Sequence, residues 1–437
     1  MKLLKNTIKI PKDAGWLMPG LEIKRWFLMI IIGTILSAIG LCIILNLRPI
    51  YFLMNLIMQI AQTVPSEIIG AIFILLGALV FVKGWQKTNY SILDISNERN
   101  RHALLEDLYR RRKLNRGPKV VAIGGGTGLS TLLKGVKHIT NNITAIVTVG
   151  DDGGSSGRLR EEMGVLPPGD IRNCIAALAD DEDLVTKLFQ YRFKTGEGLE
   201  GHSFGNLFLT ALCAITGDMV RAVIESSKVL SIRGRVLPST LDDMRLVAVM
   251  EDGSVIKGES NIPESGKKIA KLYTEPQNCK PLEEVIMAIQ DADLIILGPG
   301  SLYTSIIPNL LIRDITLAVE RAKAKKIYVC NIMTQPGETD DFSVSDHLKT
   351  ILKHANNKKI IDAVLVNDYL PEEVIQAYSA VNSKPVKFDK EEIKNIGIKI
   401  VRRRLIEENK KKLVRHSPTR VARAIYYWYR KQDKIEE

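Results

Sequence analysis

A glycine turn after a short apolar run contains the residues of this 437-residue chain that are best suited to bind a ligand. Residues 119–123 are apolar and β-branched, residues 124–128 read GGGTG, and leucines then recur at helical spacing. This pattern predicts a strand, a turn and a helix. Glycines let the backbone approach a ligand, and a helix N-terminus favours a phosphate. A tight structural connection is the alternative, because neither the dinucleotide fingerprint nor a P-loop is complete.

A pair of carboxylates follows the next predicted strand. Residues 143–149 are apolar and lead into GDDGGSSG, so that Asp151 and Asp152 come just after the strand. In open α/β folds the carboxyl ends of parallel strands share the edge at which ligands bind. A carboxylate at this position often holds a ribose hydroxyl or a metal ion. The two turns together favour a ligand site over a purely structural role.

Three further loops place polar residues between apolar segments. PPGDIRN at 167–173 puts Asp170 where it can cap a helix, and HSFGNL at 202–207 contains His202. His202 is the candidate general base, but a structural hydrogen-bonding role is favoured because the sequence pairs no nucleophile with it. A buried strand at 293–297 ends in GPGSLYTS, and a strand at 326–330 ends in NIMTQPGETD.

These loops connect strands and helices that alternate along the chain. The alternation predicts an α/β fold with a mostly parallel, Rossmann-like sheet from residue 118 to 437. Residues 246–250 and 254–257 flank a Glu-Asp-Gly turn and predict a hairpin, which would form a small antiparallel insert. Residues 363–367 are expected to form the last core strand. The basic helix predicted from residue 418 to 430 has one apolar face, which we expect to pack on the domain rather than on a membrane.

The first 117 residues predict a membrane anchor. Residues 26–47 and 68–82 are apolar enough for two transmembrane helices, preceded by a basic tail at 1–25. Residues 50–64 mix amides into apolar sequence, as in a helix that lies in the interface. Lys and Arg flank the outer ends of this hairpin at 26–83, which places both termini in the cytoplasm. A cleaved signal peptide fits less well because a second apolar segment follows. Residues 84–117 are charged and predict a partly helical linker.

The remaining composition argues against several classes of protein. Five scattered cysteines without CxxC spacing disfavour disulfides and a zinc site, and predict buried thiols in a reducing compartment. The net charge of +12 resembles that of a nucleic-acid binder. However, the basic residues cluster at the flanks of the apolar segments and at the C-terminus, without interleaved aromatic residues, so we expect no nucleic-acid partner.

Taken in order, the motifs GGGTG, DDGGSSGRL, PPGDIRN, HSFGNL, GRVLPST, GPGSLYTSIIPNLL and NIMTQPGETD resemble the bacterial gluconeogenesis factor family (YvcK-like), which is related to the archaeal 2-phospho-L-lactate transferase CofD. The resemblance runs from about residue 119 to the terminal helix. It implies a Rossmann-like domain that binds UDP-N-acetylglucosamine, and a link to cell shape, peptidoglycan synthesis and gluconeogenic growth. The CofD branch instead transfers a phospholactyl group with the help of a divalent metal. The membrane hairpin departs from the commonest members of the family.

The resemblance also suggests which residues hold the ligand. The glycine turn would bind the diphosphate, with a hydroxyl from Thr127. Asp151, Asp152 and Asp170 would bind either ribose hydroxyls or Mg²⁺, and the sequence does not decide between them. Arg158 and Arg172 would neutralise phosphate unless they lie on exposed helix faces. The expected nucleotide-sugar residues are Gly124, Gly125, Gly126, Thr127, Gly128, Asp151, Asp152, Arg158, Asp170, Asn173, Ser203, Asn206, Gly300, Ser301, Tyr303 and Thr304.

Two classes of function follow from these residues. A membrane-anchored regulator that binds a nucleotide sugar is favoured, because the site has many ligand-holding groups and no assigned acid, base or nucleophile. A metal-dependent transferase that acts on a nucleotide-activated donor is the alternative. We expect that no cofactor is required, and the sequence leaves Mg²⁺ open. Regulatory protein partners are expected, and the sequence leaves a homo-oligomer open.

Overall fold

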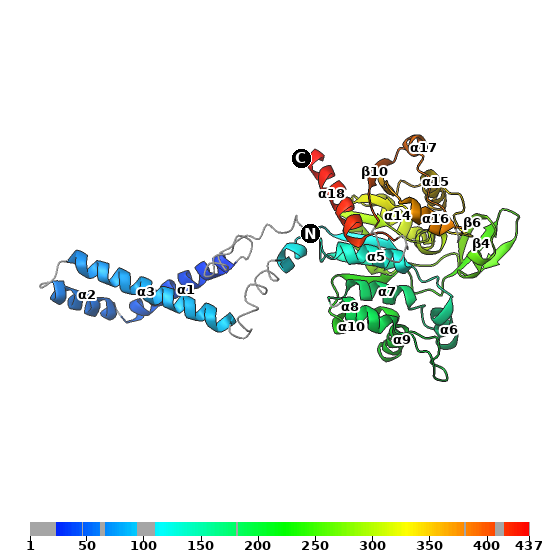
Figure 1. Cartoon of the computed structure of the whole chain (residues 1–437). Coiled ribbons are helices and arrows are strands. Elements are labelled where there is room, and N and C mark those ends of the chain that lie inside the picture. Colours follow the sequence, from blue (N-terminus) through cyan, green and yellow to red (C-terminus); the bar gives the residue numbers. More distant parts are fainter. Residues whose placement is uncertain are drawn as a thin grey trace. The chain divides into compact units, whose positions relative to one another are not determined.

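The structure is a computed structural model, which describes residues 23–45, 47–61, 66–93, 110–180, 182–379, 382–406 and 415–436. It divides into two compact units, Met1–Lys113 and Leu114–Glu437 (Figure 1). The predicted basic tail at 1–25 lies almost entirely outside the described residues, as does the middle of the predicted linker.

The first unit contains α1 (Ile23–Ile44), α2 (Arg48–Ala61) and α3 (Ser66–Leu93) in the part of the chain that is described, and its last residues, 110–113, are also helical. The two predicted spans fall largely within α1 and α3, and α2 covers most of the predicted interfacial segment. Among the described residues, no helix alone has the length and apolarity of a membrane span. Two bent helix pairs in the second unit reach that threshold together, Phe204–Thr216 with Met219–Val229 and Leu302–Leu311 with Arg313–Arg321. The membrane hairpin stays a prediction.

The second unit is built on a seven-stranded sheet in which every neighbouring pair of strands is parallel, as predicted. Its order is β10-β9-β8-β7-β1-β2-β3, and the chain changes direction across the sheet between β1 and β7. That place is the topological switch point of a doubly wound fold. The strands are β1 (Val120–Gly124), β2 (Ile143–Val147), β3 (Arg235–Pro238), β7 (Leu294–Leu297), β8 (Lys325–Val329), β9 (Ala363–Asn367) and β10 (Lys399–Arg403).

Residues 363–367 form a buried strand, β9, as predicted, but a further strand that the sequence did not predict, β10, follows it. Strand β10 pairs with β9 at one edge of the sheet, and only Val401 of its five residues is buried. An edge strand needs no continuous apolar run, because one side meets solvent. The sequence KIVRR therefore lacks the signal by which the central strands were recognised.

Helices cover both faces of the sheet and create two apolar cores. One core lies under α5, α7 and α18, and the other under α12, α14 and α15. Cys174, Cys279 and Cys330 are buried free thiols, as expected, and Cys213 is half-buried. The helices of the second unit not given elsewhere are α5 (Gly126–Val136), α6 (Gly154–Met163), α7 (Gly169–Leu178), α8 (Glu182–Gln190), α9 (Phe204–Thr216), α10 (Met219–Val229), α12 (Glu283–Gln290), η3 (Leu302–Ile306), α13 (Ile307–Leu311), α14 (Arg313–Arg321), α15 (Val344–His354), α16 (Glu372–Ser379) and α17 (Lys390–Asn395).

The predicted hairpin is confirmed as part of a three-stranded antiparallel insert. Strands β4 (Arg245–Met250), β5 (Val255–Lys257) and β6 (Ile269–Glu275) pair in the order β5-β4-β6, and the short helix α11 (Asn261–Glu264) follows β5. Gly253 supplies the positive φ of +82° that the turn needs. Buried Leu246 and Leu272 join the insert to the core beside α12. Figure 1 shows β4 and β6 at one side of the unit.

The terminal helix α18 (Pro418–Glu436) packs on the domain, as predicted. Val421, Ala422 and Ile425 are buried in the core that α5 also covers. The approach to α5 is so close that a Cβ at Gly135 would lie 2.0 Å from the carbonyl oxygen of Pro418. A glycine at this point of α5 is thus required for the packing of α18.

Candidate functional site

A cavity of about 480 Å³ opens at the carboxyl ends of β1, β2, β7 and β8. This is the switch point of the sheet, where open α/β folds bind ligands. The lining residues come from turns far apart in the sequence: Gly125, Gly126, Thr127, Gly128, Thr131, Thr148, Asp151, Asp170, Glu259, Pro299, Gly300, Ser301, Thr304, Ser305, Asn331, Ile332, Met333, Thr334, Gln335, Tyr378, Ser383, Arg415 and His416.

The glycine turn after β1 forms one wall of the cavity. Gly126 has a φ of +61°, which favours glycine, and no side chain caps the N-terminus of α5. A Cβ at Gly128 would lie 2.4 Å from the carbonyl oxygen of Pro299, so the two glycine turns touch. The first turn of a helix leaves N–H donors without helical partners. This wall can therefore donate hydrogen bonds to a phosphate.

Three carboxyl groups face the same cavity, Asp151, Asp170 and Glu259. Burial raises the pKa of Asp170 to about 7, and the charge of Asp151 adds to the rise, whereas the Gly126 N–H donor opposes it. Burial likewise raises the pKa of Glu259 to about 8, with a further contribution from the charge of Asp151. Two groups that titrate near neutrality in one cavity are typical of a functional site.

Asp152 turns away from the cavity, although it is adjacent to Asp151. Its carboxylate accepts hydrogen bonds from the backbone N–H groups of Glu259 at 2.8 Å and Ser260 at 2.9 Å, and from the Ser260 hydroxyl at 2.8 Å. Asp152 thus ties the turn after β2 to the loop that follows β5. Sequence reasoning missed Glu259, because nothing in the local sequence shows that this loop reaches the site.

The opposite end of the cavity, at β8, combines amide, aromatic and apolar groups. The Asn331 amide donates to Gln335 Oε1 at 3.1 Å, and the Gln335 amide donates to Ser301 Oγ at 2.6 Å. Tyr378 and His416 also line this end. Burial lowers the pKa of His416 to about 4, so its imidazole is neutral at physiological pH. The motif NIMTQPGETD predicts this loop, but the sequence does not indicate which of its side chains line the cavity.

Several predicted site residues lie outside the cavity lining. Arg158 is exposed on α6 and donates to the carbonyl oxygen of Glu200 at 2.9 Å. Tyr303 is buried, and its ring packs edge-on against Phe342 and His354. Asn173 accepts a hydrogen bond from Arg172. Gly124 ends β1 just before the turn, and Ser203 and Asn206 lie in a separate cluster.

That cluster surrounds His202, which is buried with its Nδ1 3.0 Å from Ser155 Oγ. The Asn206 amide donates to the same hydroxyl at 3.0 Å, and Arg172 donates to Ser203 Oγ at 2.5 Å. Ser203 also caps α9. Burial lowers the pKa of His202, with a further contribution from the charge of Arg158. The sequence had not paired Ser155 with His202, and the contacts favour a hydrogen-bonded link between α6 and α9.

Only two of the three predicted metal ligands, Asp151 and Asp170, line the cavity. Among the residues that the structure describes, no three His, Cys, Asp or Glu side chains come close enough to hold a metal ion. Asp151 and Asp170 do face one cavity, whereas Asp152 is bonded to the insert. Mg²⁺ is commonly bound by one or two carboxylates together with phosphates of the substrate. These two aspartates therefore fit an ion that enters with a phosphate ligand.

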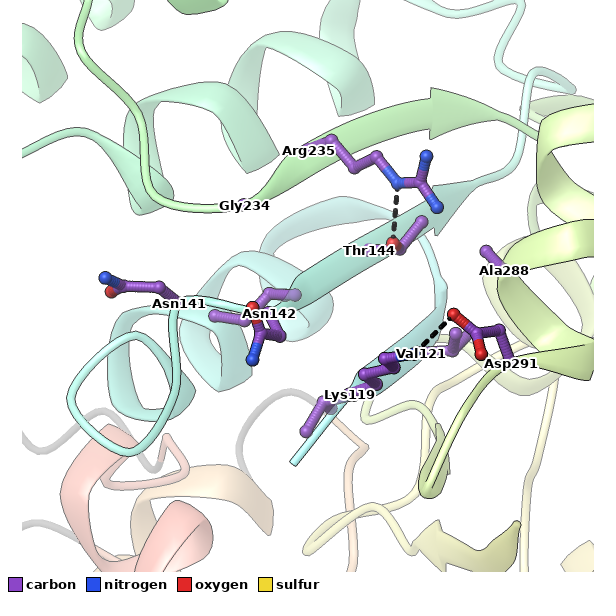
Figure 2. Close-up of a pocket in the computed structure, with 11 residues that line it drawn as sticks. Lys119, Val121, Asn141, Asn142, Thr144, Gly234, Arg235, Ala288 and Asp291 are labelled. Atoms are coloured by element: carbon purple, nitrogen blue, oxygen red, sulfur yellow. Dashed lines mark hydrogen bonds and ion pairs between the residues drawn. The ribbon is translucent and has the colours of Figure 1, made fainter. Parts of the chain in front are cut away.

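A second pocket, of about 290 Å³, lies at the opposite, amino-terminal end of the strands (Figure 2). Arg235 Nε donates to Thr144 Oγ1 at 2.9 Å, and Lys119 Nζ pairs with Asp291 Oδ2 at 2.7 Å. The Asn142 amide donates to the carbonyl oxygens of Asn115 and Gly117. Most of these polar groups are bonded within the protein, whereas Asn141 Oδ1 is buried without a hydrogen-bond partner, and the Lys119–Asp291 pair is exposed.

Comparison with known proteins agrees with this geometry. The family model for 2-phospho-L-lactate transferase CofD matches residues 120–406. The gluconeogenesis factor of Bacillus subtilis (strain 168) is 52% identical over 306 residues, which are 70% of this chain and 96% of that protein. The crystal structure of a UPF0052 family member from Bacillus halodurans superposes with a TM-score of 0.68 at 46% identity and covers 70% of this chain and 99% of that one.

A longer relative matches both units of the chain. A protein of Nostoc sp. (strain PCC 7120), provisionally named a gluconeogenesis factor, is 51% identical over 430 residues, 97% of this chain and 94% of its own length. Relatives with and without a counterpart of the first unit therefore exist, and the domain with the cavity is common to both. The chain belongs to the gluconeogenesis factor family of CofD-related proteins.

Proposed function

We propose that this protein is a membrane-anchored regulator that binds a nucleotide sugar, UDP-N-acetylglucosamine, and acts on cell shape, peptidoglycan synthesis and gluconeogenic growth. The observation that carries the proposal is the cavity at the switch point, where a glycine turn faces side chains that can hold a sugar and a base. The gluconeogenesis-factor name of the Bacillus subtilis relative supports the link to gluconeogenic growth.

The two ends of the cavity suit different parts of such a ligand. The N-terminus of α5 offers donors to a diphosphate. The linked amides of Asn331 and Gln335 have both donors and acceptors, as a uracil requires. The carboxyl groups of Asp151, Asp170 and Glu259 can accept hydrogen bonds from sugar hydroxyls. In this arrangement the diphosphate lies between the base and the sugar.

The membrane anchor is part of the same proposal. Helices α1 and α3 consist largely of apolar residues, and many of these are exposed. Basic residues flank the outer ends of both apolar segments, which favours a two-pass anchor with both termini and the globular unit in the cytoplasm. Protease protection in sealed membrane vesicles tests this topology: only the short segment between α1 and α3 should face the outside.

Ligand binding is tested by calorimetric titration of the full chain in detergent micelles with UDP-N-acetylglucosamine and Mg²⁺. Chromatography then shows the chemical state of the ligand. Binding with the ligand recovered intact supports a regulator. Binding with release of UDP or UMP identifies an enzyme, and the absence of binding refutes the assigned ligand.

The alternative is a metal-dependent transferase, favoured by the match to the CofD family model and by Asp170, which titrates near neutrality inside the cavity. Replacing Asp151 or Asp170 with Asn distinguishes the two functions. In a transferase either change should abolish metal-dependent turnover. In a regulator, it should change only the affinity for the ligand.

A further inference from the structure

The loop after β5 carries a carboxyl group from the antiparallel insert into the cavity. Glu259 lines the cavity with Asp151 and Asp170, although the three residues belong to different turns. The Thr304 side chain, in the helical segment that follows β7, opposes the rise in the pKa of Glu259 and therefore lies beside its carboxyl group. The insert therefore contributes directly to the site and does more than cover the core.

Asp152 fixes the backbone at this point. Its carboxylate accepts hydrogen bonds from Glu259 N, Ser260 N and Ser260 Oγ, between positions more than 100 residues apart in the chain. The preceding Gly258 has a φ of +98°, and a Cβ there would lie 2.7 Å from Asp152 Oδ2. The loop can thus approach Asp152 only with glycine at this position. This contact holds Glu259 in place before any ligand arrives.

The cavity is lined by both donor and acceptor groups. The N-terminus of α5 can donate to phosphate oxygens, and Asp170 lies beside it, since a Cβ on Gly125 would be 2.6 Å from Asp170 Oδ2. Asp151, Asp170 and Glu259 carry carboxyl oxygens that accept hydrogen bonds, and hydroxyl groups are the natural partners of these oxygens. A site built to bond hydroxyls discriminates strongly against a ligand that lacks them, because its buried polar groups are then left unpaired.

We propose that Glu259 is a specificity-determining residue that selects a nucleoside diphosphate bearing a sugar over the nucleoside diphosphate alone, and that Asp152 is the positioning residue that holds it there. The inference rests on the proposed nucleotide-sugar function. It adds the group that reads the sugar and gives the antiparallel insert a role in recognition.

The test compares the affinities of the full chain in detergent micelles for UDP-N-acetylglucosamine and for UDP, with Mg²⁺ present throughout. Wild-type protein should prefer the sugar nucleotide. Glu259→Ala should weaken binding of the sugar nucleotide by about 10-fold to 100-fold, the range expected when a buried sugar hydroxyl is left without its hydrogen-bond partner. Its affinity for UDP should stay unchanged. Glu259→Gln should restore part of the preference, because its amide oxygen still accepts a hydrogen bond.

Two further variants complete the design. Asp152→Asn should reduce the preference in the same direction while UDP binding is retained, a pattern that general destabilisation would not give. Glu264→Gln alters an exposed carboxylate on α11 of the same insert and should have no effect on either ligand.

The outcomes separate the two proposals. If wild-type protein binds neither ligand, the proposed function fails and this inference fails with it. If wild-type protein binds both, but Glu259→Ala weakens both equally or neither, the inference is overturned while nucleotide binding stands. A wild-type protein without preference for the sugar nucleotide also overturns the inference.

Discussion

The two ends of the parallel sheet carry similar kinds of residues, but the charged groups at one end lie in a cavity and those at the other end form an exposed ion pair. At the carboxyl end, Asp170 and Glu259 lie in a cavity where burial raises the pKa of both towards or above neutrality. At the amino end, Lys119 and Asp291 neutralise each other in the open (Figure 2). Carboxyl groups whose pKa is raised by burial cost stability when they ionise, so they mark the end of the sheet that is adapted to a ligand.

Both ends also depend on a glycine at a close contact. Gly128 touches the backbone of Pro299 in the cavity wall, and Gly234 has a φ of +86° with its virtual Cβ 2.5 Å from the carbonyl oxygen of Ile143. The steric demands are comparable. Under the proposed function only Gly128 contacts the ligand. Substitutions at Gly128 and Gly234 should therefore differ in their effect on ligand affinity.

The largest expected effect is on ligand binding by Gly128→Ala. The added methyl group must displace the backbone at Pro299, and we expect the affinity for the nucleotide sugar to fall at least about 100-fold, which corresponds to about 2.7 kcal/mol. Gly234→Ala should lower the free energy of unfolding by a similar amount to Gly128→Ala, about 1–3 kcal/mol, but leave affinity unchanged. Chemical denaturation and calorimetry measure the two quantities. An equal loss of affinity in both variants would show that the effect is not specific to the cavity.

The next effect concerns the pH dependence of stability. The pKa of Asp170 rises to about 7 in the folded protein, so the folded state holds this proton more tightly than the unfolded chain does. The resulting stabilisation is complete below about pH 4 and is lost as the pH rises through 7. Asp170→Asn should remove this dependence, a change on the order of 2–4 kcal/mol across that range.

Urea denaturation between pH 4 and 8 measures this difference. The matched variant at the amino end is Asp291→Asn, which alters an exposed carboxylate with a lysine partner. Its unfolding curves should follow those of the wild type at every pH. If the free energy of unfolding of Asp170→Asn depended on pH as that of the wild type does, the pKa of Asp170 would not be raised in the folded protein.

A smaller effect is expected from the amides at each end. Gln335→Ala removes the amide that links Asn331 to Ser301 and should weaken nucleotide binding by about 10-fold. Asn142→Ala removes two hydrogen bonds to backbone carbonyl oxygens at the amino end. It should lower the free energy of unfolding by about 1–2 kcal/mol and leave affinity unchanged. If Asn142→Ala weakened binding as strongly, the two ends would not be functionally distinct.

Much of the carboxyl end could be predicted from the sequence, because three of the four strands there, β1, β2 and β7, are apolar runs that end at or close to a glycine. That local pattern located the turns at Gly125–Gly128 and Gly300 and the carboxylate pair Asp151 and Asp152, whereas Asp170 came from the helix-capping motif PPGDIRN and the family resemblance. It could not choose between Asp151 and Asp152. Which carboxylate faces the cavity depends on where the antiparallel insert packs, and that is decided by contacts more than 100 residues away.

The residues that were missed share this dependence on distant packing. Glu259 follows an edge strand of the insert, and Arg415 and His416 precede the terminal helix, so neither segment has a strand-turn-helix pattern that points to the site. Conversely, Tyr303 lies in a correctly identified turn but faces the core. Local sequence predicts where a turn lies, whereas the direction of each side chain depends on which helix covers that face of the sheet.

The smallest effect is expected from breaking the exposed ion pair at the amino end. Asp291→Ala leaves Lys119 without its partner, but water and salt screen both charges, so the melting temperature should not change measurably. The affinity for the nucleotide sugar should also stay within about twofold of wild type, since distant sites without shared partners act independently. Thermal denaturation and calorimetry on the same sample check both values. A larger loss of affinity would mean that the two ends of the sheet are energetically coupled, and the amino-end pocket would then belong to the functional machinery.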